Sequence, residues 1–579
     1  MSLAPIDWII IAATLAGAAA IGTLLSGRSG RSVADYFLAG RRFPWWVAGT
    51  SMVATTFAAD TPLAVAGLVA TGGIAGNWIW WSAAFGSTLT VFFFARLWRR
   101  AGILTDVELA EVRYSGGPAA LLRGFRAVYL GFPINCVVMG WVNLAMAKVL
   151  DVTLGWDRLT AVFVSLTITG LYSAVGGLWG VAMTDIAQFT LAMTGSVALA
   201  WFALSAPGVG GLDGLVRQLP GTTFDLVPTL GAPDGLATAA ALPVAAFLAY
   251  VTVQWWASWY PGQEPGGGGY VAQRMMSARD ERHAFLATLW FTIAHYCLRP
   301  WPWILVGLAS MVLYPGITDK EAGYVLVLRD HLPAGWRGLL LGAFFAAYMS
   351  TISTQLNWGT SYLINDVYRR FIRTDAAEPH YVRASRVTTL LLMAASGVLT
   401  LYLESVRGAW EFVLESGAGI GLVLILRWYW WRVNAWSEMA AMGAAALGYA
   451  GLRLFTSLVF PNSLFVLVTW TTLCWVAVTF ATRPEPDHHL VAFYQRVRPG
   501  GPGWRRFAAR TGQAPPAAIG GLLLDWIAGW LMVYAVLLGV GELLFRGAST
   551  ALPFLAVAGT TGWWLTRRLG RKGWAVVTG

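Results

Sequence analysis

Charged residues are scarce in this chain of 579 residues, because Asp, Glu, Lys and Arg together make up only 12% of it. Hydrophobic residues make up 57%, and the mean hydropathy is +0.59. A soluble globule carries about a quarter of charged residues, so this composition excludes that class. Apolar runs of roughly 20 residues are also much longer than the strands of a membrane barrel. The sequence therefore predicts an all-α polytopic membrane protein.

Cysteine and histidine are also few, with three and six residues. Cys136, Cys297 and Cys474 lie in apolar stretches without paired spacing, so we expect neither a disulfide nor a zinc site. His488 and His489 are adjacent in a basic segment, which is not metal-ligand spacing on one helix face. The net charge of +11 comes from short basic segments between apolar runs, which indicates membrane orientation and no nucleic-acid partner.

About 15 apolar segments are long enough to cross a membrane, given the roughly 20 residues that a spanning helix needs. Their centres lie near residues 16, 57, 88, 137, 166, 194, 247, 300, 350, 393, 420, 446, 473, 531 and 558. Arginine-rich connections alternate with connections that hold few cations, so the positive-inside rule places the N-terminus outside the cell and the C-terminus inside. We expect a multi-pass protein of the cell membrane, such as a bacterial inner membrane. The basic connections are 28–42, 96–126, 274–282, 369–386, 427–432, 483–510 and 567–572.

The second apolar segment is interrupted at its middle, where Asp60 and Pro62 follow several hydroxyl residues. A proline at mid-membrane removes a backbone hydrogen bond, and a carboxylate there is costly unless it has a function. We therefore predict a broken helix at a binding site, with a simple proline kink and a capping Asp60 as the alternative. The seventh segment, 236–259, is similarly followed by a proline- and glycine-rich stretch, 261–269. Interrupted helices five segments apart predict an inverted five-plus-five repeat.

This repeat divides the chain into five parts. Residues 1–43 form an extra N-terminal helix and a basic cytoplasmic loop, and residues 44–206 form the first five-helix repeat. Residues 207–235 form an extracellular loop, and residues 236–432 form the second repeat. Residues 433–579 form about four peripheral helices with a basic loop at 483–517.

Hydroxyl groups follow one face of the ninth segment. Ser350, Ser353, Thr354 and Asn357 recur at helical spacing, with Thr351 beside them. Hydroxyls can join membrane helices by hydrogen bonds, which is the alternative interpretation. Five polar side chains on one patch favour a site for sodium, which binds neutral oxygen ligands. The carbonyls of the broken helix, at Ala54 and Phe57, could complete that site.

The chain resembles the solute:sodium symporter family, which includes bacterial proline, sugar and sialic acid carriers. The resemblance rests on four stretches that occur in order: Asp35–Gly40, Leu171–Trp179 with Thr184–Gln188, Tyr270–Arg274, and Ser350–Thr351 with Asn365–Tyr368. It covers residues 5 to 430 and more loosely the C-terminal helices. It implies a LeuT-type inverted-repeat fold and sodium-driven symport of an organic solute.

The resemblance also implies particular sodium ligands. The shared sodium site of the family falls on the carbonyls of Ala54, Phe57 and Ala347 and the hydroxyls of Ser350 and Thr351. In the sialic acid branch a possible second sodium site resembles the group formed here by Asp185, Ser350, Ser353 and Thr354. The alternative for Asp185 is that it caps the start of the sixth spanning helix.

The solute is less well defined by the sequence. Trp80 and Tyr296 stand where the sugar branch has a carboxylate and a lysine, and Thr55 stands where the proline branch has an aspartate. Aromatic faces and hydroxyls favour a sugar or a similar neutral solute, although several tryptophans could serve packing alone. Arg299 needs a partner, for which we expect Asp60 or Glu264 rather than an anionic solute. The candidate solute-binding residues are Thr56, Asp60, Thr61, Trp80, Trp256, Tyr260, Tyr296 and Arg299.

Three classes of function compete. We expect sodium-coupled symport of a small polar solute into the cell by alternating access. An amino acid or carboxylate symporter is an alternative, and so is a membrane sensor that reuses the transporter fold. No Ser/His or paired-Asp constellation lies at catalytic spacing in the apolar segments, so an enzyme is not predicted. The expected ligands are sodium ions, the solute and the lipid bilayer, without an obligate protein partner.

Overall fold

A computed structural model describes residues 3–26, 38–173, 178–228, 243–259 and 264–571. Every long element among these residues is a helix, as the apolar composition predicts. Eight of the described helices are long and apolar enough to cross a membrane, and the bent pair α3 and α4 is a ninth. Four shorter apolar helices accompany them. Each of the expected segment centres lies in a helix or at a break between two helices, while the span count and orientation stay predictions.

The helices of the N-terminal half are as follows. They are α1 (Pro5–Ser26), α3 (Trp45–Thr55), α4 (Asp60–Gly72), α5 (Trp78–Trp81), α6 (Ala83–Leu89), α7 (Ala95–Ala101), α8 (Leu109–Arg113), α9 (Gly116–Tyr129), α10 (Asn135–Leu154), α11 (Arg158–Ser173), α12 (Leu178–Ser205), α13 (Gly211–Gln218), α14 (Val244–Ala249) and α15 (Trp255–Ala257).

The helices of the C-terminal half continue this order. They are α16 (Gly269–Ser277), α17 (Glu281–Ile293), α18 (Pro300–Leu313), α19 (Gly323–His331), α20 (Trp336–Ser361), α21 (Glu378–Thr400), α22 (Val406–Ser416), α23 (Ile420–Tyr429), α24 (Ala435–Phe455), α25 (Asn462–Ala481), α26 (Asp487–Val497), α27 (Arg505–Thr511), α28 (Ile519–Phe545) and α29 (Ala548–Arg571).

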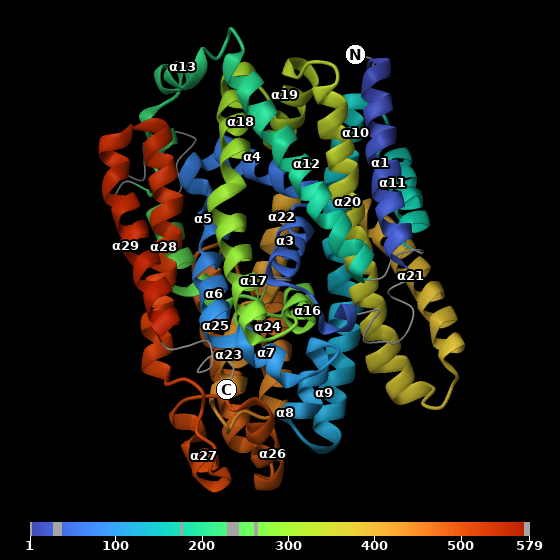
Figure 1. The fold of residues 1–579 in the computed structure, drawn as a ribbon, viewed down its shortest axis with the longest axis vertical. Helices are drawn as coiled ribbons and strands as arrows, with labels where there is room; N and C mark the ends of the chain where they lie inside the picture. Colours follow the sequence, from blue (N-terminus) through green and yellow to red (C-terminus); the bar gives the residue numbers. More distant parts are fainter. Residues whose placement is uncertain (1–2, 27–37, 174–177, 229–242, 260–263, 572–579) are drawn as a thin grey trace.

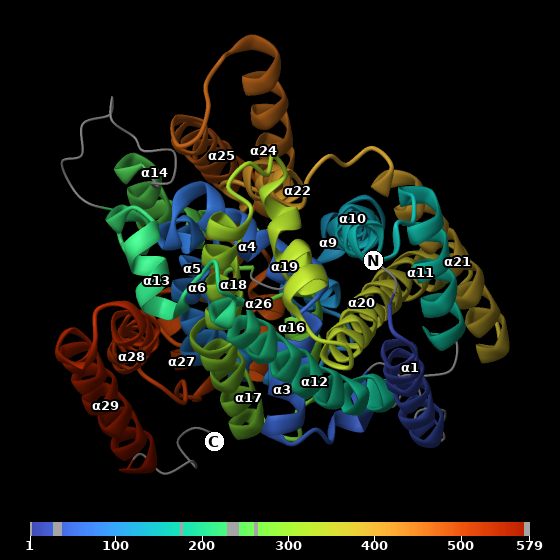
Figure 2. The same cartoon turned by 90° about the horizontal axis from the view of Figure 1, so that it is seen from above.

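The broken pair α3 and α4 lies at the centre of the molecule and is surrounded by other helices (Figures 1 and 2). α3 packs against α12, α17 and α20, and α4 packs against α18. These packings are close, because a Cβ added to Gly49 would lie 2.6 Å from the Ala287 carbonyl oxygen, and one added to Gly307 would lie 3.0 Å from the Ala66 Cα. Small residues let membrane helices approach in this way.

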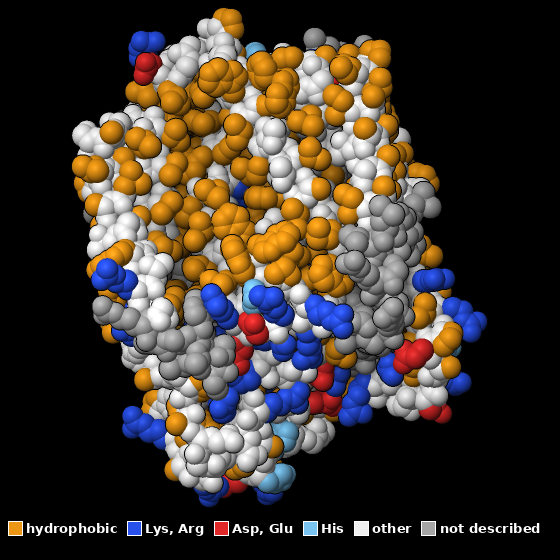
Figure 3. All heavy atoms as spheres, in the orientation of Figure 1, with side chains coloured by type: hydrophobic (Ala, Val, Ile, Leu, Met, Phe, Trp, Pro, Cys, Tyr) orange, Lys and Arg blue, Asp and Glu red, His pale blue; other side chains and the backbone are white. Residues whose placement is uncertain are grey.

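Three helix pairs lie at the periphery. Figure 2 shows α24 with α25, α28 with α29, and α11 with α21 around the central helices. The α28–α29 pair packs mainly within itself, and α28 also contacts α6. Figure 3 shows hydrophobic side chains over most of one face, while Lys and Arg side chains gather in its lower third near α26 and α27. This distribution fits an apolar membrane belt with a basic region at one end.

Several arginines of the expected basic connections are buried, and two of them form ion pairs with buried carboxylates. Arg126 on α9 donates a hydrogen bond to the Glu438 carboxylate on α24 at 2.7 Å. Arg427 on α23 lies 3.4 Å from both Glu438 and Glu264. Their side chains are at most 4% exposed. Glu438 lies far from Arg126 along the chain, and Glu264 lies far from Arg427, so these ion pairs tie α24 to the central helices.

Candidate functional site

The prediction of a broken helix is confirmed. α3 ends at Thr55 and α4 begins at Asp60, and the two helix axes differ by 60°. Pro62 lies in the first turn of α4, where its missing N–H breaks no helical hydrogen bond. Asp60 lies in the same first turn, where the helix dipole stabilises a carboxylate. The capping role that we considered for Asp60 is therefore compatible with a place beside a binding site.

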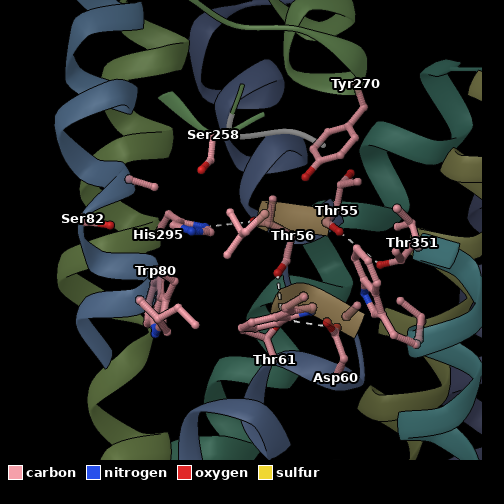
Figure 4. Close-up of a pocket in the computed structure, with 18 of the residues that line it drawn as sticks. Thr55, Thr56, Asp60, Thr61, Trp80, Ser82, Ser258, Tyr270, His295 and Thr351 are labelled. Atoms are coloured by element: carbon pink, nitrogen blue, oxygen red, sulfur yellow. Dashed lines mark hydrogen bonds between the residues drawn. The ribbon is translucent and has the colours of Figure 1, made fainter. Parts of the chain in front are cut away.

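A cavity lies at this break (Figure 4). The space between its lining atoms is about 920 Å³, a volume that includes space open to solvent. Its walls come from the α3–α4 pair, α5, α6, α10, α15, α16, α20, α22 and the segment between α17 and α18. Five of the expected solute-binding residues line it: Thr56, Asp60, Thr61, Trp80 and Arg299.

The other expected solute-binding residues have different positions. Tyr296 is fully buried and stacks on Trp80 with ring centroids 5.8 Å apart, so it supports the cavity wall and does not line it. Trp256 does not line the cavity either, and its indole N–H donates to the Thr252 carbonyl of its own helix. Its neighbour Trp255 lines the cavity instead. Tyr260 lies outside the described residues.

Arg299 contacts the end of α3. Its guanidinium donates to the Val53 carbonyl at 3.3 Å and to the Thr56 hydroxyl at 3.0 Å, and it lies 5.4 Å from the centroid of the Trp303 ring. The ion pairs among the described residues do not include one between Arg299 and Asp60, and Glu264 pairs with Arg126 and Arg427. The Arg299 and Asp60 charges nevertheless lie close enough to interact, so the expected pairing stays a prediction.

His295 completes this polar corner of the cavity. Its Nδ1 lies 3.1 Å from the Thr56 hydroxyl, and its Nε2 lies 3.3 Å from an Arg299 nitrogen. Figure 4 shows the Thr56 and His295 side chains pointing toward one another beside the break. On the other side, the Thr61 hydroxyl donates to the Thr56 carbonyl at 3.1 Å. These hydrogen bonds hold the Thr56 hydroxyl, the His295 ring and the Arg299 guanidinium in place on one side of the cavity.

Three further residues bring unsatisfied polar groups to the cavity. The hydroxyls of Ser82 and Ser258 and the amide oxygen of Gln355 are buried, and they have no hydrogen-bond partner in the part of the chain that the structure describes. All three residues line the cavity. Buried polar groups without a partner are costly, and although such groups occur elsewhere in the described chain, a polar ligand in the cavity would satisfy these three.

Aromatic rings form much of the remaining wall. Several residues that line the cavity, aromatic and polar, were not predicted from the sequence. Ser82, Ser258, Trp141, Gln254 and Trp410 carry no local sequence signal, because the fold brings them together from separate helices. Gln355 and Tyr270 lie in stretches that the sequence did single out, the hydroxyl-rich segment and the family-like Tyr270–Arg274 stretch. The tryptophans on the wall are Trp80, Trp141, Trp255 and Trp410.

The expected sodium ligands lie where α20 meets the end of α3. Thr351 donates a hydrogen bond to the Thr55 carbonyl at 3.1 Å and also lines the cavity. Ala54 and Phe57 lie on either side of this carbonyl at the break, and Ala347 and Ser350 lie on the preceding turn of α20. The fold thus brings helix-end carbonyls and hydroxyls into one region next to the cavity, a chemistry suited to a small monovalent cation.

Asp185 on α12 belongs to a buried cluster behind this region. It accepts hydrogen bonds from Ser51 at 2.6 Å and from Ser350. Arg274 on α16 donates to Ser51 and to Thr354, each at 3.3 Å. Arg274 is fully buried, although it lies in one of the expected basic connections. The Asp185 side chain faces these groups, which argues against a capping role alone.

A broken helix beside a polar cavity, inside a bundle of apolar helices, is the architecture of a membrane transporter. The model of the sodium:solute symporter family matches residues 36–445. The chain belongs to this family, as the sequence motifs predicted, and it is a multi-pass membrane protein that uses sodium as its coupled ion. Its activity is solute transport and not an enzymatic reaction.

Several curated relatives are sugar transporters. The chain is 26% identical to the sodium/glucose cotransporter 4 of Danio rerio, over 82% of this chain and 78% of the relative. It is 24% identical to the sodium/glucose cotransporter of Vibrio parahaemolyticus, over 72% and 78% of the two chains. It is 27% identical to a sodium/mannose cotransporter of Bos taurus, over 77% and 79%.

A solved structure shares the fold. A sodium-coupled sialic acid symporter in a substrate-bound outward-open state superimposes with a TM-score of 0.66 at 18% sequence identity. The match covers 84% of this chain and 99% of that chain. This similarity establishes the fold alone, and the residues that bind sodium and solute must be argued from the geometry of the site.

Proposed function

We propose that the protein imports a neutral polyhydroxylated solute, a sugar in the first instance, together with sodium. The observation that carries this proposal is the group of unpartnered oxygens of Ser82, Ser258 and Gln355 in a cavity walled by tryptophans. Sugar hydroxyls both donate and accept hydrogen bonds, so they can satisfy such groups. The apolar faces of a sugar ring pack on aromatic rings. The names of the curated relatives, which include glucose and mannose carriers, support the same class.

The proposal places sodium at the break between α3 and α4. Its ligands are the carbonyls of Ala54, Phe57 and Ala347 and the hydroxyls of Ser350 and Thr351. Two contacts support this assignment. Thr351 donates a hydrogen bond to a carbonyl at the end of α3, and Ser350 donates one to Asp185, which leaves the Ser350 lone pairs available to a cation. A sodium ion there would join α20 to the broken helix.

The proposal includes the wider organisation of the chain. Residues 44–206 and 236–432 form the two inverted halves that alternate access to the cavity, and the peripheral helices after residue 433 surround them. The N-terminus lies outside the cell membrane and the C-terminus inside. The charged end of the molecule near α26 and α27 then faces the cytoplasm, in agreement with the positive-inside rule.

A carboxylate solute is a second candidate, because Arg299 lines the cavity and can bind an anion. Two observations favour the neutral solute. The guanidinium of Arg299 already donates to Val53 and Thr56, and the Asp60 carboxylate lines the same cavity and would repel an anion.

Uptake into proteoliposomes tests the proposal. Radiolabelled glucose, galactose, mannose, proline and sialic acid are compared under an inward sodium gradient and an equal potassium gradient. We expect sodium-stimulated uptake of at least one neutral sugar, strongly reduced in Gln355→Leu and Ser258→Ala. Ser361→Ala is the matched control, because this buried serine of α20 bonds to its own helix and lies outside the cavity. If only sialic acid is taken up, and Arg299→Gln abolishes this uptake, the transported solute is an anion and the proposal of a neutral solute is wrong.

A further inference from the structure

One cation at the border between the central helices and the peripheral pair α28–α29 lacks a carboxylate partner. Arg96 lies in the first turn of α7, and its side chain is partly buried. In the part of the chain that the structure describes, its buried Nε has no hydrogen-bond partner and no ion pair includes its guanidinium. The guanidinium lies 5.0 Å from the centroid of the Phe285 ring on α17. A partly buried arginine needs a counter-charge, so we looked for one among its neighbours.

Both carboxylates near Arg96 are bound by other arginines. The charges of Glu281 and Asp525 lie close enough to interact with that of Arg96. However, Glu281 accepts hydrogen bonds from Arg100 on both of its oxygens, at 2.7 and 2.9 Å, and Asp525 pairs with Arg568. Three arginines therefore share two carboxylates, and this group of side chains carries one excess positive charge.

The surroundings of Arg96 are those of a membrane interface. The Phe285 ring belongs to a buried apolar cluster that joins α17 to α29 through Leu565, and Trp526 and Trp564 of the peripheral pair pack against this cluster. Tryptophan is enriched at the level of the lipid headgroups. Arg96 also lies about 12 Å along the helix from the expected centre of its apolar segment near residue 88, whereas the hydrocarbon core extends roughly 15 Å from its centre. The long arginine side chain can therefore reach the headgroup region.

We propose that Arg96 binds the phosphate of an anionic phospholipid where α7 and α17 meet the peripheral pair α28–α29. The fork of an arginine matches two phosphate oxygens, and one excess positive charge favours a lipid with a net negative charge over a zwitterionic lipid. The lipid joins the peripheral pair to the central helices. The inference does not depend on the proposed sodium or solute sites, and the proposed orientation places the lipid in the cytoplasmic leaflet, at the end of the molecule where Lys and Arg side chains gather (Figure 3).

Thermal unfolding of the purified, delipidated full-length protein in detergent tests the proposal. Phosphatidylglycerol, phosphatidylcholine and inorganic phosphate are titrated separately, because a ligand that binds only the folded state raises the unfolding midpoint. We expect phosphatidylglycerol to raise the wild-type midpoint much more than phosphatidylcholine does. Equal shifts with the two lipids would overturn the selection of an anionic lipid. A shift with inorganic phosphate as large as that with phosphatidylglycerol would assign a soluble anion to the site and overturn the lipid.

Arg96→Gln tests whether this arginine holds the lipid. The variant removes a charge that has no partner in the lipid-free protein, so its midpoint without lipid should equal or exceed that of the wild type. The dissociation constant for phosphatidylglycerol, obtained from the midpoint titration, should rise at least about tenfold, because a charge-assisted contact is lost. Arg96→Lys keeps the charge without the fork and should give an intermediate value. An unchanged dissociation constant in Arg96→Gln would overturn the proposal.

Arg567→Gln is the matched control, because Arg567 is an exposed arginine of α29 next to Arg568 and lies 4.4 Å from the centroid of the exposed Trp563 ring. Its dissociation constant for phosphatidylglycerol should stay close to the wild-type value. Equal weakening in Arg567→Gln and Arg96→Gln would indicate a general attraction of anionic lipid to a basic surface and would overturn the site. If Arg96→Gln does not fold, native mass spectrometry of the wild type and Arg96→Lys decides: the wild type should retain one phosphatidylglycerol molecule that Arg96→Lys releases more readily, and equal retention would contradict the role of Arg96.

Discussion

Replacing Thr351 by valine removes one hydroxyl from the proposed sodium site and almost nothing else. The two side chains have nearly the same shape, and Thr351 is only 4% exposed. A hydrogen bond to a charged group contributes about 1.5–3 kcal/mol, and we take this as the scale for a hydroxyl that ligates sodium. Since 1.4 kcal/mol corresponds to a factor of ten, the half-saturating sodium concentration should rise about 10- to 150-fold.

The assay is the sodium dependence of uptake in proteoliposomes at a fixed sugar concentration. Thr351→Ser keeps the hydroxyl and should stay close to the wild type. Thr360→Val is the matched control on the same helix, because the Thr360 hydroxyl is buried and pairs with the Thr389 hydroxyl at 3.0 Å, outside the cavity. A half-saturating concentration in Thr351→Val within twofold of the wild type would refute the assignment of Thr351 as a ligand.

Three further changes have defined expectations. Asp60→Asn and Arg299→Gln should show a coupling energy of at most about 1 kcal/mol in a double-mutant cycle of uptake, because their charges interact but none of the described ion pairs joins them. A clearly larger coupling energy would indicate a direct ion pair. Glu438→Gln should destabilise the protein by about 3–5 kcal/mol, because the buried Arg126 and Arg427 lose their shared carboxylate partner. The measurement is the thermal unfolding midpoint in detergent, and an unchanged midpoint would show that these ion pairs do not stabilise the protein. Gln355→Leu should raise the solute KM about tenfold with little change in the maximal rate, because it removes a contact to the bound solute. A fall in the maximal rate with an unchanged KM would instead assign Gln355 to a step after solute binding.

The broken helix could be predicted from sequence because its causes are local. Pro62 and Asp60 stand next to each other in a hydroxyl-rich stretch, and each is unfavourable in a continuous membrane helix. The hydroxyl stripe at Ser350 and Thr351 was likewise visible, because helical spacing alone places these residues on one face. The fold class and the family followed from the composition and from short motifs.

The cavity walls and the buried charges could not be predicted in the same way. Trp141, Ser258 and Trp410 come from three helices that are far apart in sequence, and nothing near each residue marks it as a cavity residue. Arg274 and Arg126 look like loop cations, because a charged residue between apolar segments is usually solvated. Their burial depends on partners such as Asp185 and Glu438, which only the tertiary structure brings close.

The proposed sodium and solute sites share Thr351, and this arrangement would couple them. The Thr351 side chain lines the cavity, and its hydroxyl contacts the Thr55 carbonyl at the end of α3, so an ion held by both would fix the position of α20 against the broken helix. A solute that contacts Thr55 and Gln355 on either side of that junction binds best when the junction is fixed. Thermodynamic linkage then requires that the solute raise the affinity for sodium by the same factor by which sodium raises the affinity for the solute. Removing the Thr351 hydroxyl should reduce both factors equally, whereas a residue that contacts the solute alone should weaken its binding and leave the factor unchanged.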